Sequence, residues 1–320
     1  MRLIGVSVVK NEADIIEAMI RHNVRFLDHM LVLDHDSGDA TASILQSLVA
    51  EGVPLTLVNV ANQYSAFDQA EFTTALARRA FATHAADYVF PLDADEFLKV
   101  ASREALREAL EAAGPNVACM RWPTYVPDLD EPSRHPLRLM RWRVESEAAA
   151  LFKIVVPRQV AEAEGWSIAR GNHAFHRKMG NDVLWTTGNL LPDVELAHFP
   201  MRMPEQATTK MLIGWLTRRL SYGPNAGRTS NSWHFQEVFR RIVAGETMTP
   251  LQMRDYAIAL YALGSKSVEA DPACFRLVED AFAEAMPLRY TPAQNVDPLR
   301  LLAIWTSLQI DRFMQAQLPA

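Results

Sequence analysis

Three acidic side chains, Asp93, Asp95 and Glu96, directly follow a short apolar run in this chain. That run, Tyr88–Leu92, is predicted to be a buried strand of a parallel sheet, because it is apolar and bounded by charge. Ligands of open α/β sheets collect at the carboxyl ends of such strands. Asp93 and Asp95 can project toward one point, where carboxylates suit a hard divalent cation shared with a substrate's phosphates. The alternative is an acidic turn in which Asp95 or Ser102 only caps the next helix.

Two earlier strand ends also carry polar residues. The first predicted strand, Leu3–Val9, ends in a cation, an amide and a carboxylate: Lys10, Asn11 and Glu12. The second, Met30–Leu33, ends in Asp34, which can accept a hydrogen bond from a ribose hydroxyl or a base N–H. In a parallel sheet these ends can face the same edge as Asp93. Together they suit a nucleotide diphosphate, whose charge requires a metal and whose base requires hydrogen bonds.

Strand and helix patterns alternate over the first hundred residues, which favours a mostly parallel sheet with right-handed crossovers. Helices are predicted where apolar residues recur at helical spacing, over Ala13–Leu27, Ile44–Val49, Phe67–Ala85 and Arg103–Ala112. Further strands are predicted over Leu55–Val60, Val117–Met120, Leu137–Trp142, Leu151–Val156 and Val194–His198.

Only helices are predicted after Pro204, over Glu205–Leu220, Ser232–Val243, Pro250–Leu263, Pro272–Ala285 and Pro298–Met314. This change of periodicity places a domain boundary between residues 203 and 204. The helices carry apolar stripes such as Met211, Leu212, Trp215 and Leu216, which cannot remain in water as one large patch. We therefore expect the region 204–320 to pack on the domain formed by residues 1–203, or to mediate a homodimer.

Composition limits the classes of protein that fit. The 320 residues are 49% hydrophobic and 22% charged, which is ordinary for a globular protein. A net charge of −6 argues against a broad nucleic-acid surface. The only two cysteines, Cys119 and Cys274, suggest neither a disulfide framework nor a cysteine zinc site. Neither a signal peptide nor an apolar run near ~20 residues is found, so a cytoplasmic enzyme without a membrane span is expected.

Three motifs resemble family 2 glycosyltransferases of the GT-A fold, in a branch with a Lys-Asn-Glu start and an Asp-x-Asp-Glu-Phe motif. They are Lys-Asn-Glu at 10–12, Asp-His-Asp-Ser-Gly-Asp-Ala-Thr at 34–41 and Asp-Ala-Asp-Glu-Phe at 93–97. His35 and Asp36 stand where Asn and Gly are usual. Asp39 and Thr41 of the same turn are expected to cap the following helix. The resemblance implies a GT-A-type, Rossmann-like mixed sheet that is mostly parallel, with a C-terminal helical appendage.

Two later segments extend the resemblance over about the first two-thirds of the chain. His198 begins a stretch through Gln206 that is similar to the branch's His-Tyr-Pro-x-Arg-Ser-x-Glu-Gln. Phe199 replaces its Tyr and Met203 replaces its Ser. Gly-Asn-His at 171–173 resembles a Gly-x-His element that precedes it.

The resemblance implies a metal, Mn²⁺ or Mg²⁺, that bridges the donor's diphosphate. Asp95 would bind it, Asp93 would assist or bind ribose, and His198 would complete the site. Sharing one ion requires the late strand to lie beside the strand that ends at Asp93. The alternative for His198 is a core histidine next to Phe199.

Cations further along the chain are candidates for the leaving diphosphate. The resemblance implies that Arg202 and Lys210 neutralise it. The alternative is a solvated basic face shared with Arg218 and Arg219. Arg78, on the long predicted helix, is a weaker phosphate candidate that could simply be exposed.

Inverting transfer also requires a base that takes the proton of the acceptor hydroxyl. Glu195, three residues before His198, is the first candidate and His173 the second. Other carboxylates could arrive from acceptor loops: Asp128, Asp130 and Glu147. For each of these residues a plain surface charge is an equal alternative.

The predicted function is a metal-dependent, inverting glycosyltransferase. Its donor would be a nucleotide diphosphate sugar, with a UDP-sugar as first choice, and its acceptor a glycan, a lipid-linked saccharide or another hydroxyl compound. One rival is a sugar-nucleotide pyrophosphorylase, although no glycine-rich phosphate loop follows the first strand. Another is a non-catalytic nucleotide-sugar-binding or scaffold protein with the same fold.

Overall fold

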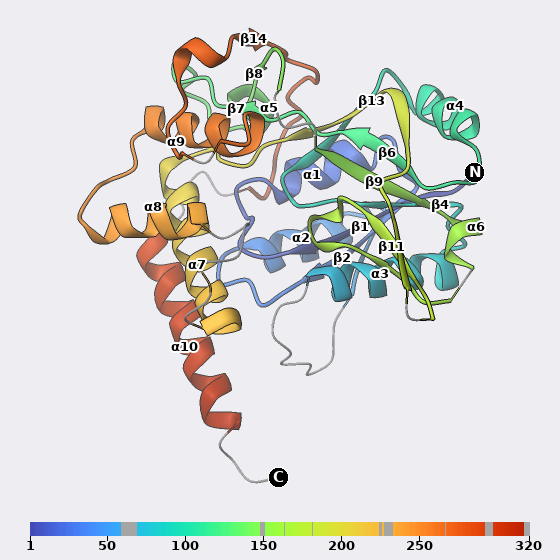
Figure 1. The fold of residues 1–320 in the computed structure, drawn as a ribbon, viewed down its shortest axis with the longest axis horizontal. Helices are drawn as coiled ribbons and strands as arrows, with labels where there is room; N and C mark the ends of the chain where they lie inside the picture. The colour runs from blue at the N-terminus through green and yellow to red at the C-terminus, as the bar shows by residue number, and fades with distance from the viewer. Residues whose placement is uncertain are drawn as a thin grey trace. The chain divides into compact units, whose positions relative to one another are not determined.

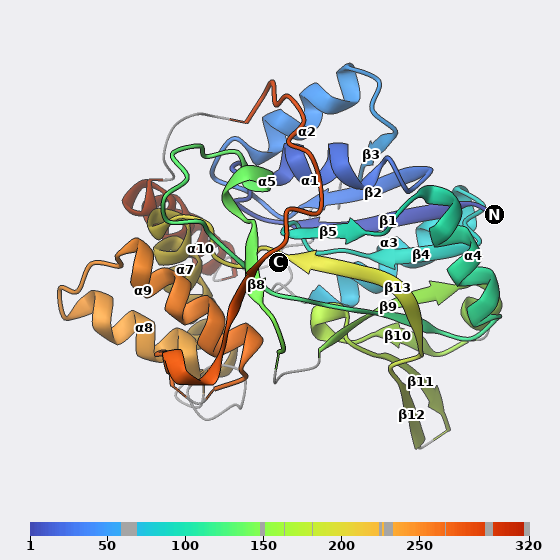
Figure 2. The same ribbon diagram turned by 90° about the horizontal axis from the view of Figure 1, so that it is seen from above.

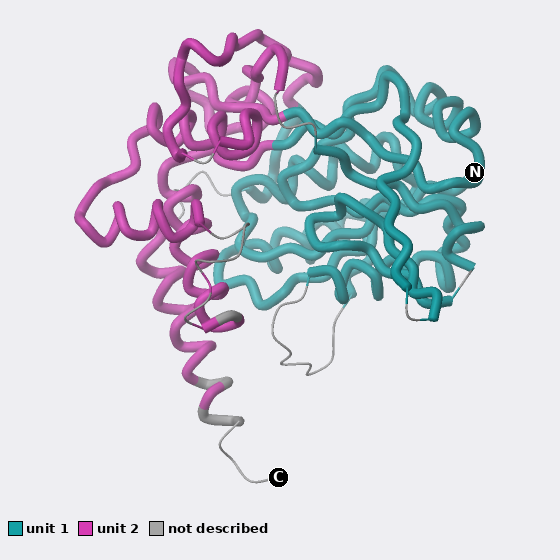
Figure 3. The backbone as a smooth tube through the Cα atoms, viewed as in Figure 1, with its two compact units in different colours: residues 1–123, 150–198, 286–291 teal, residues 124–149, 199–285, 292–320 magenta. Residues whose placement is uncertain are grey.

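A computed structural model describes residues 1–58, 69–147, 151–162, 164–180, 182–223, 226, 233–265, 267–291 and 297–316. The chain forms two compact units (Figure 3). Unit 1 comprises Met1–Pro123, Ala150–His198 and Met286–Thr291, and unit 2 comprises Thr124–Ala149, Phe199–Ala285 and Pro292–Ala320. The chain passes five times from one unit to the other, so neither unit is a continuous stretch of sequence.

Unit 1 is built on an eight-stranded mixed sheet (Figure 1). Its strands are β1 Leu3–Val9, β2 His29–Asp34, β3 Leu55–Leu57, β4 Tyr88–Pro91, β5 Glu96–Lys99, β6 Ala118–Arg121, β9 Phe152–Pro157 and β13 Asn189–His198. Their order in the sheet is β3-β2-β1-β4-β9-β6-β13-β5. The pairs β3–β2, β2–β1, β1–β4 and β6–β13 are parallel, and the other three are antiparallel. The predicted mixed, mostly parallel α/β sheet is confirmed.

Both faces of this sheet are covered. The helices of unit 1 are α1 Ile16–Asn23, α2 Thr41–Ala50, α3 Gln69–Thr83, α4 Arg103–Ala113 and the short α6 Arg158–Ala161. On one face, Phe72 and Leu76 of α3 join a core that contains Ile4 and Val6 of β1. Successive strand residues face opposite ways, so Gly5 faces the other side. A side chain there would meet Leu27 Cδ1 at 2.9 Å, so glycine permits the segment after α1 to lie against the strand.

A second, antiparallel sheet of unit 1 consists of β10 Trp166–Ile168, β11 Phe175–Met179 and β12 Asp182–Thr186, in that order. A 3₁₀ turn, η1, at Arg170–Asn172 lies between β10 and β11 in the chain. Helix α3 holds the outer edge of β10, because Ile168 N donates to Thr74 Oγ1 (2.9 Å) and Arg78 Nη2 donates to Trp166 O (2.6 Å). β12 is the last strand at the opposite edge.

Unit 2 is mainly helical, with a three-stranded antiparallel sheet in the order β14-β8-β7. Its elements are β7 Tyr125–Val126, α5 Pro136–Leu139, β8 Trp142–Val144, α7 Pro204–Tyr222, α8 Trp233–Val243, α9 Pro250–Ala257, the π-helix η3 Ile258–Ala262, the 3₁₀ turn η4 Pro272–Cys274, β14 Leu277–Glu279 and α10 Pro298–Ala316. Its core packs Met211 and Trp215 of α7 against Phe235 and Val238 of α8 and Tyr256 of α9.

Two predicted elements are wrong. The predicted strand Leu137–Trp142 is interrupted, because Pro136 starts the short helix α5 and His135 Nδ1 accepts a hydrogen bond from Leu137 N (3.2 Å). The predicted helix Pro272–Ala285 is only a 3₁₀ turn, and β14 then pairs with β8, with Leu277 opposite Val144. The region after residue 204 is therefore not purely helical.

Other predicted elements differ mainly in their ends. The helix predicted over Ala13–Leu27 is shorter, at Ile16–Asn23. Three predicted termini, Val60, Phe67 and Ser232, lie outside the described residues. The predicted boundary at 203/204 and the packing of the C-terminal region stay predictions. Within the described part of the chain, no helix combines the length and apolar character needed to cross a membrane.

A strap of unit 1, Met286–Thr291, is fixed by the fully buried carboxylate of Glu17 on α1. Glu17 accepts hydrogen bonds from the backbone N–H of Arg289 (2.8 Å), Tyr290 (2.8 Å) and Thr291 (2.7 Å). It also accepts one from Arg21 Nε (2.9 Å). Burial acts to raise the pKa of Glu17, but these hydrogen bonds outweigh it and lower the pKa below its ordinary value.

Glu17→Gln is expected to loosen the strap, because the amide group turns donors toward backbone N–H groups that need an acceptor. Hydrogen–deuterium exchange should become at least ~10-fold faster at the amides of 289–291, as expected if roughly 1–3 kcal/mol of local stability is lost. Glu108→Gln, on the exposed face of α4, is the matched control, since an exposed surface charge contributes little to stability. Unchanged exchange in Glu17→Gln would contradict this role.

Candidate active site

The carboxyl ends of β1, β2 and β4 reach one edge of the sheet, as predicted. β1 runs parallel to β2, with Val9 opposite Asp34, and parallel to β4, with Val6 opposite Pro91. The polar residues that follow these strands therefore gather at one edge. This edge is the candidate active site.

The turns after β1 and β2 are joined by hydrogen bonds. Asn11 N donates to Ser37 Oγ (2.9 Å), and Gly38 N donates to Asn11 Oδ1 (2.7 Å). Glu12 N donates to Thr41 Oγ1 (2.8 Å). The Lys-Asn-Glu and Asp-to-Thr motifs thus form one braced structure, which neither sequence pattern shows by itself.

Asp39 and Thr41 do more than cap α2. The N-cap position is Ala40, without a side-chain capping bond. Asp39 Oδ1 accepts from Thr41 N (2.9 Å), as a capping carboxylate would. Its Oδ2 accepts from Ala13 N (3.1 Å) of the other turn. The predicted capping role is therefore only part of what the two residues do.

Asp34 lies in this braced structure, where its carboxylate accepts hydrogen bonds from Ser37 N (3.2 Å) and from the Ser37 hydroxyl. Burial raises the pKa of Asp34 above its ordinary value, and the Ser37 hydrogen bonds oppose that change. Asp36 has φ of 54°, in the left-handed region that glycine adopts most readily. Aspartate tolerates this conformation better than most residues, so the turn keeps its shape without the usual glycine.

Asp93 is held by three donors. Its Oδ2 accepts from Lys153 Nζ (2.7 Å), and its Oδ1 accepts from Gln69 Nε2 (2.7 Å) and Asn172 Nδ2 (3.1 Å). Both oxygens are therefore already engaged by protein groups. Asn172 Oδ1 is buried and has no hydrogen-bond partner within the described residues, so it offers a free acceptor beside Asp93.

Glu96 is fully buried in the same network. Its Oε1 accepts from Trp122 Nε1 (2.7 Å) and Lys153 Nζ (2.7 Å), and its Oε2 accepts from Asp93 N (2.8 Å). Burial raises the pKa of Glu96, the charges of Asp93 and Asp95 add to this, and Lys153 opposes it. Burial would lower the pKa of Lys153, but the charges of Asp93 and Glu96 outweigh it, so Lys153 stays an ammonium ion.

Asp95 and His198 come together from positions about a hundred residues apart. His198 Nε2 lies 3.7 Å from Asp95 Oδ2, and both side chains are buried. The predicted strand arrangement, with the late strand beside the strand that ends at Asp93, is wrong, because β13 does not lie beside β4. It pairs with β5, with His198 opposite Glu96, and that pairing brings His198 next to Asp95.

Trp122 connects these groups. Its ring stacks on His198, with centroids 3.8 Å apart at 23°. Lys153 Nζ lies 4.7 Å from its centroid, and the His173 ring lies edge-to-face with it, with centroids 5.3 Å apart. Sequence reasoning missed both Trp122 and Lys153. A single charge within the apolar strand β9 is a signal that could have identified Lys153, whereas Trp122 gives none.

His173, the second candidate base, lies in this network as a neutral imidazole. Its Nδ1 donates to Phe152 O (2.8 Å), since a carbonyl can only accept, and Nε2 is left as an acceptor. Burial, together with the charge of Lys153, lowers the pKa of His173 to about 4, although the hydrogen bond to Phe152 acts in the opposite direction. Gly171 has φ of 75°, and a Cβ there would meet the His173 ring at 2.7 Å, so glycine is needed to seat this imidazole.

Glu195, the first candidate base, is not brought to the Asp95–His198 pair. It lies roughly 10 Å before His198 along β13, and the odd spacing turns it to the other face of the sheet. There its carboxylate pairs with Lys99 Nζ (3.2 Å). The other candidates, Asp128, Asp130 and Glu147, belong to unit 2.

The three candidate phosphate-binding cations have structural contacts. Arg202 and Lys210 belong to unit 2. Arg202 is only 2% exposed and donates from Nη1 to Phe199 O (2.8 Å), so it does not belong to a solvated basic face. Lys210 Nζ donates to Pro200 O (3.0 Å). Arg78 holds β10 and lies 5.1 Å from the Trp166 ring centroid.

Asp95 and His198 can hold one side of a small divalent cation. Two ligand atoms at about 2.0–2.2 Å from one ion lie roughly 3–4 Å apart. The 3.7 Å between His198 Nε2 and Asp95 Oδ2 falls in this range. No group of three or more His, Cys, Asp or Glu side chains suited to a metal occurs within the described residues. The remaining coordination positions would therefore come from substrate and water, as is usual for a metal bound with phosphates.

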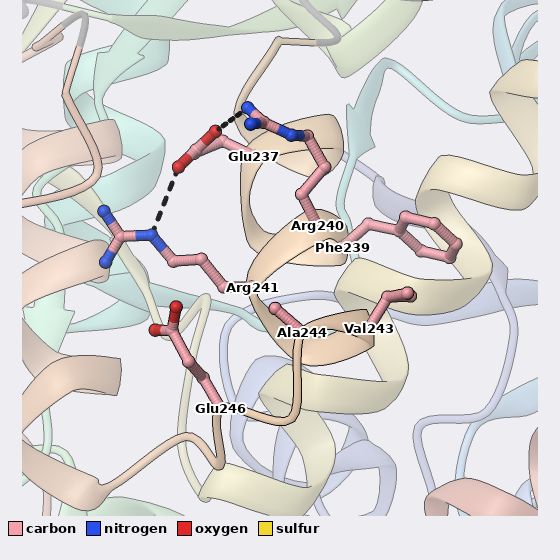
Figure 4. Close-up of a pocket in the computed structure, with 7 residues that line it drawn as sticks. All are labelled: Glu237, Phe239, Arg240, Arg241, Val243, Ala244 and Glu246. Carbon is pink, nitrogen blue, oxygen red and sulfur yellow. Dashed lines mark hydrogen bonds and ion pairs between the residues drawn. The ribbon is translucent and has the colours of Figure 1, made fainter.

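A surface hollow lies elsewhere, at the end of α8 in unit 2 (Figure 4). It encloses about 700 Å³ and is lined by Glu237, Phe239, Arg240, Arg241, Val243, Ala244 and Glu246. Arg240 and Arg241 form ion pairs with Glu237 at 2.9 and 3.2 Å. None of these residues belongs to the candidate site, so we do not assign the chemistry to this hollow.

No family model matches the chain, and no curated protein matches its sequence. S. aureus TarS in complex with UDP-GlcNAc matches at a TM-score of 0.40 and 8% identity, over 76% of this chain and 72% of that one. The mannosyltransferase PcManGT from Pyrobaculum calidifontis, in complex with GDP-Man and Mn²⁺, matches at 0.36 and 15% identity, over 81% of each chain. Mannosyl-3-phosphoglycerate synthase from Rubrobacter xylanophilus matches at 0.31 and 20% identity, over 50% and 54%. At such TM-scores the likeness carries no weight for activity or substrate.

Lys153→Met is expected to destabilise the protein by about 3–5 kcal/mol, because it leaves buried carboxylates without their cation. Adding Glu96→Gln should recover at least about 1 kcal/mol, since one of those charges is then removed. Denaturant unfolding of the two single variants and the double variant measures this coupling. Strictly additive effects would show that Lys153 and Glu96 do not depend on each other.

His173 is expected to stay neutral down to about pH 4. Because its pKa is lower in the folded state than in the unfolded one, its contribution to stability is complete above pH 6.5. That contribution is lost as the pH falls toward about 4, to a limit of about 3 kcal/mol. NMR titration of ¹³C-labelled histidines, with His173→Gln for assignment, should show no His173 shift between pH 8 and pH 5.5. A midpoint near 6.5 would contradict the buried, Lys153-facing environment.

Proposed function

We propose that this protein is a glycosyltransferase that uses a nucleotide diphosphate sugar and a divalent metal. The observation that carries the proposal is that His198 Nε2 and Asp95 Oδ2 lie 3.7 Å apart at the sheet edge where β1, β2 and β4 end. They belong to two separate motifs, and only the fold brings them together. The braced turns at the ends of β1 and β2 lie at the same edge and supply polar groups for a nucleoside.

The metal would be held by Asp95 and His198, and it would neutralise the donor's diphosphate as that group leaves. Asp34 would bind the ribose or base, and Lys10 would supply a positive charge near the phosphates. Asn172 Oδ1 would accept a hydrogen bond from a hydroxyl of the donor sugar, because it is a buried acceptor without a protein partner in the described residues. Arg202 and Lys210 stay our candidates for contact with the leaving diphosphate.

We propose His173 Nε2 as the group that takes the proton from the acceptor hydroxyl. With a pKa of about 4, its basicity is comparable to that of the carboxylates that commonly do this work. The acceptor oxygen would form its bond to the anomeric carbon while the bond to the diphosphate oxygen breaks. The electron pair leaves with the diphosphate, and the configuration at the anomeric carbon is inverted.

The proposal is tested by hydrolysis of UDP-sugars and GDP-sugars, with and without Mn²⁺. We expect release of the nucleoside diphosphate that requires Mn²⁺, and a loss of about 100-fold or more in Asp95→Asn and in His198→Ala. Glu108→Gln, on the exposed face of α4, is the control and should retain full activity. Metal-dependent binding of a donor without turnover would favour a binding or scaffold protein instead. Formation of a nucleotide sugar from a nucleoside triphosphate would favour a pyrophosphorylase.

The two candidate bases are distinguished by matched amide variants. His173→Gln is expected to lower transfer by about 100-fold while donor affinity, measured by calorimetry with Mn²⁺, stays within about twofold. Glu195→Gln should leave both quantities nearly unchanged, because Glu195 faces the other side of the sheet. Loss of transfer in Glu195→Gln, with transfer retained in His173→Gln, would identify Glu195 as the base instead.

A further inference from the structure

The hairpin of β11 and β12 exposes an unusual amount of apolar surface for a water-facing element. Met179 is 57% exposed, Val183 43%, Leu184 59% and Trp185 59%. Figure 2 shows the hairpin projecting away from the main sheet of unit 1. Single exposed apolar residues need no explanation, but four within one short hairpin indicate an interaction surface.

No strand among the described residues pairs with the outer edge of β12, and this edge lacks the usual protection against pairing. The opposite edge of this sheet, β10, is held by Thr74 and Arg78 of α3. β12 is the last strand on its side, and it pairs with β11 without a bulge. Natural edge strands are commonly protected by lysine, proline or a bulge. β12 has none of these, and Asp182 is its only charge.

We propose that β12 pairs with β12 of a second copy of this chain, antiparallel and centred on Leu184. In this register Val183 of one copy lies opposite Trp185 of the other, and Asp182 lies opposite Thr186. Aromatic and β-branched residues form favourable cross-strand pairs, and the aspartate can accept a hydrogen bond from the threonine hydroxyl. No like charges face each other. The strand sequence is thus complementary to itself.

The faces of the paired strands agree with this register. Val183 and Trp185 lie on one face of β12 and Leu184 lies on the other. The two-fold axis would place two valines and two tryptophans together on one face, and the two leucines in contact on the other. Five residues from each copy form a small interface, so a concentration-dependent dimer is expected rather than a permanent one. This inference does not depend on the proposed function.

Sedimentation of the full chain over a range of concentrations tests the proposal. Wild type should shift from monomer to dimer as concentration rises. Leu184→Lys and Leu184→Asp should each be monomeric over the same range, because each places two like charges opposite one another. Leu299→Lys, which changes an exposed leucine of α10 (76% exposed) in the same way, should dimerise like wild type.

A mixture of Leu184→Lys and Leu184→Asp distinguishes the register. If the two copies meet at residue 184, the mixture should dimerise although each variant alone does not. A wild type that stays monomeric, a Leu184→Lys variant that still dimerises, or a mixture that stays monomeric would each overturn the proposal. Flotation of a monomeric wild type with phosphatidylcholine–phosphatidylserine vesicles, abolished by Leu184→Lys, would assign the hairpin to a membrane surface and overturn it as well.

Discussion

The buried ammonium group of Lys153 is the interaction on which the candidate site depends. Asp93, Asp95 and Glu96 place three carboxylates within four residues, and burying such charges together is costly unless they are paired. Lys153 contacts two of them, Asp93 and Glu96, at 2.7 Å each. Asp95 faces His198 instead. One cation from a neighbouring strand thus compensates two of the three acidic side chains of this motif.

Aromatic packing by Trp122 fixes the positions of the two histidines beside the acidic residues, whose charge Lys153 compensates. Trp122 contacts His198 and His173 with its ring and donates to Glu96 from its indole nitrogen. Each histidine therefore has one face or edge held by a rigid indole. Such support limits the orientations of both imidazoles before any substrate binds. The entropy cost of ordering these side chains is then not added during the reaction.

Much of the fold was predictable because its cause is local. The apolar run Leu3–Val9 is a buried strand and is found with the predicted bounds, and the strand-end motifs share one sheet edge. Lys153 and Trp122 were missed because their roles arise only from strand pairing, which brings β9 and β6 together. β14 was missed for a similar reason. Residues 277–279 satisfy a helical pattern, yet their extended form is stabilised by pairing with β8, far away in sequence.

The strap at Met286–Thr291 has a consequence for the order in which the protein can be completed during its synthesis. Glu17 emerges from the ribosome early, but the backbone groups that it binds lie more than 270 residues later. Until these backbone N–H groups emerge, the Glu17 carboxylate lacks the donors that it needs when buried. It must therefore stay in contact with water, and α1 cannot take its final packed position. Unit 1 therefore cannot reach its final structure when residue 198 has been added, although its sheet is then complete in sequence. A ribosome-bound chain that stops before the strap should remain a partly folded substrate for chaperones.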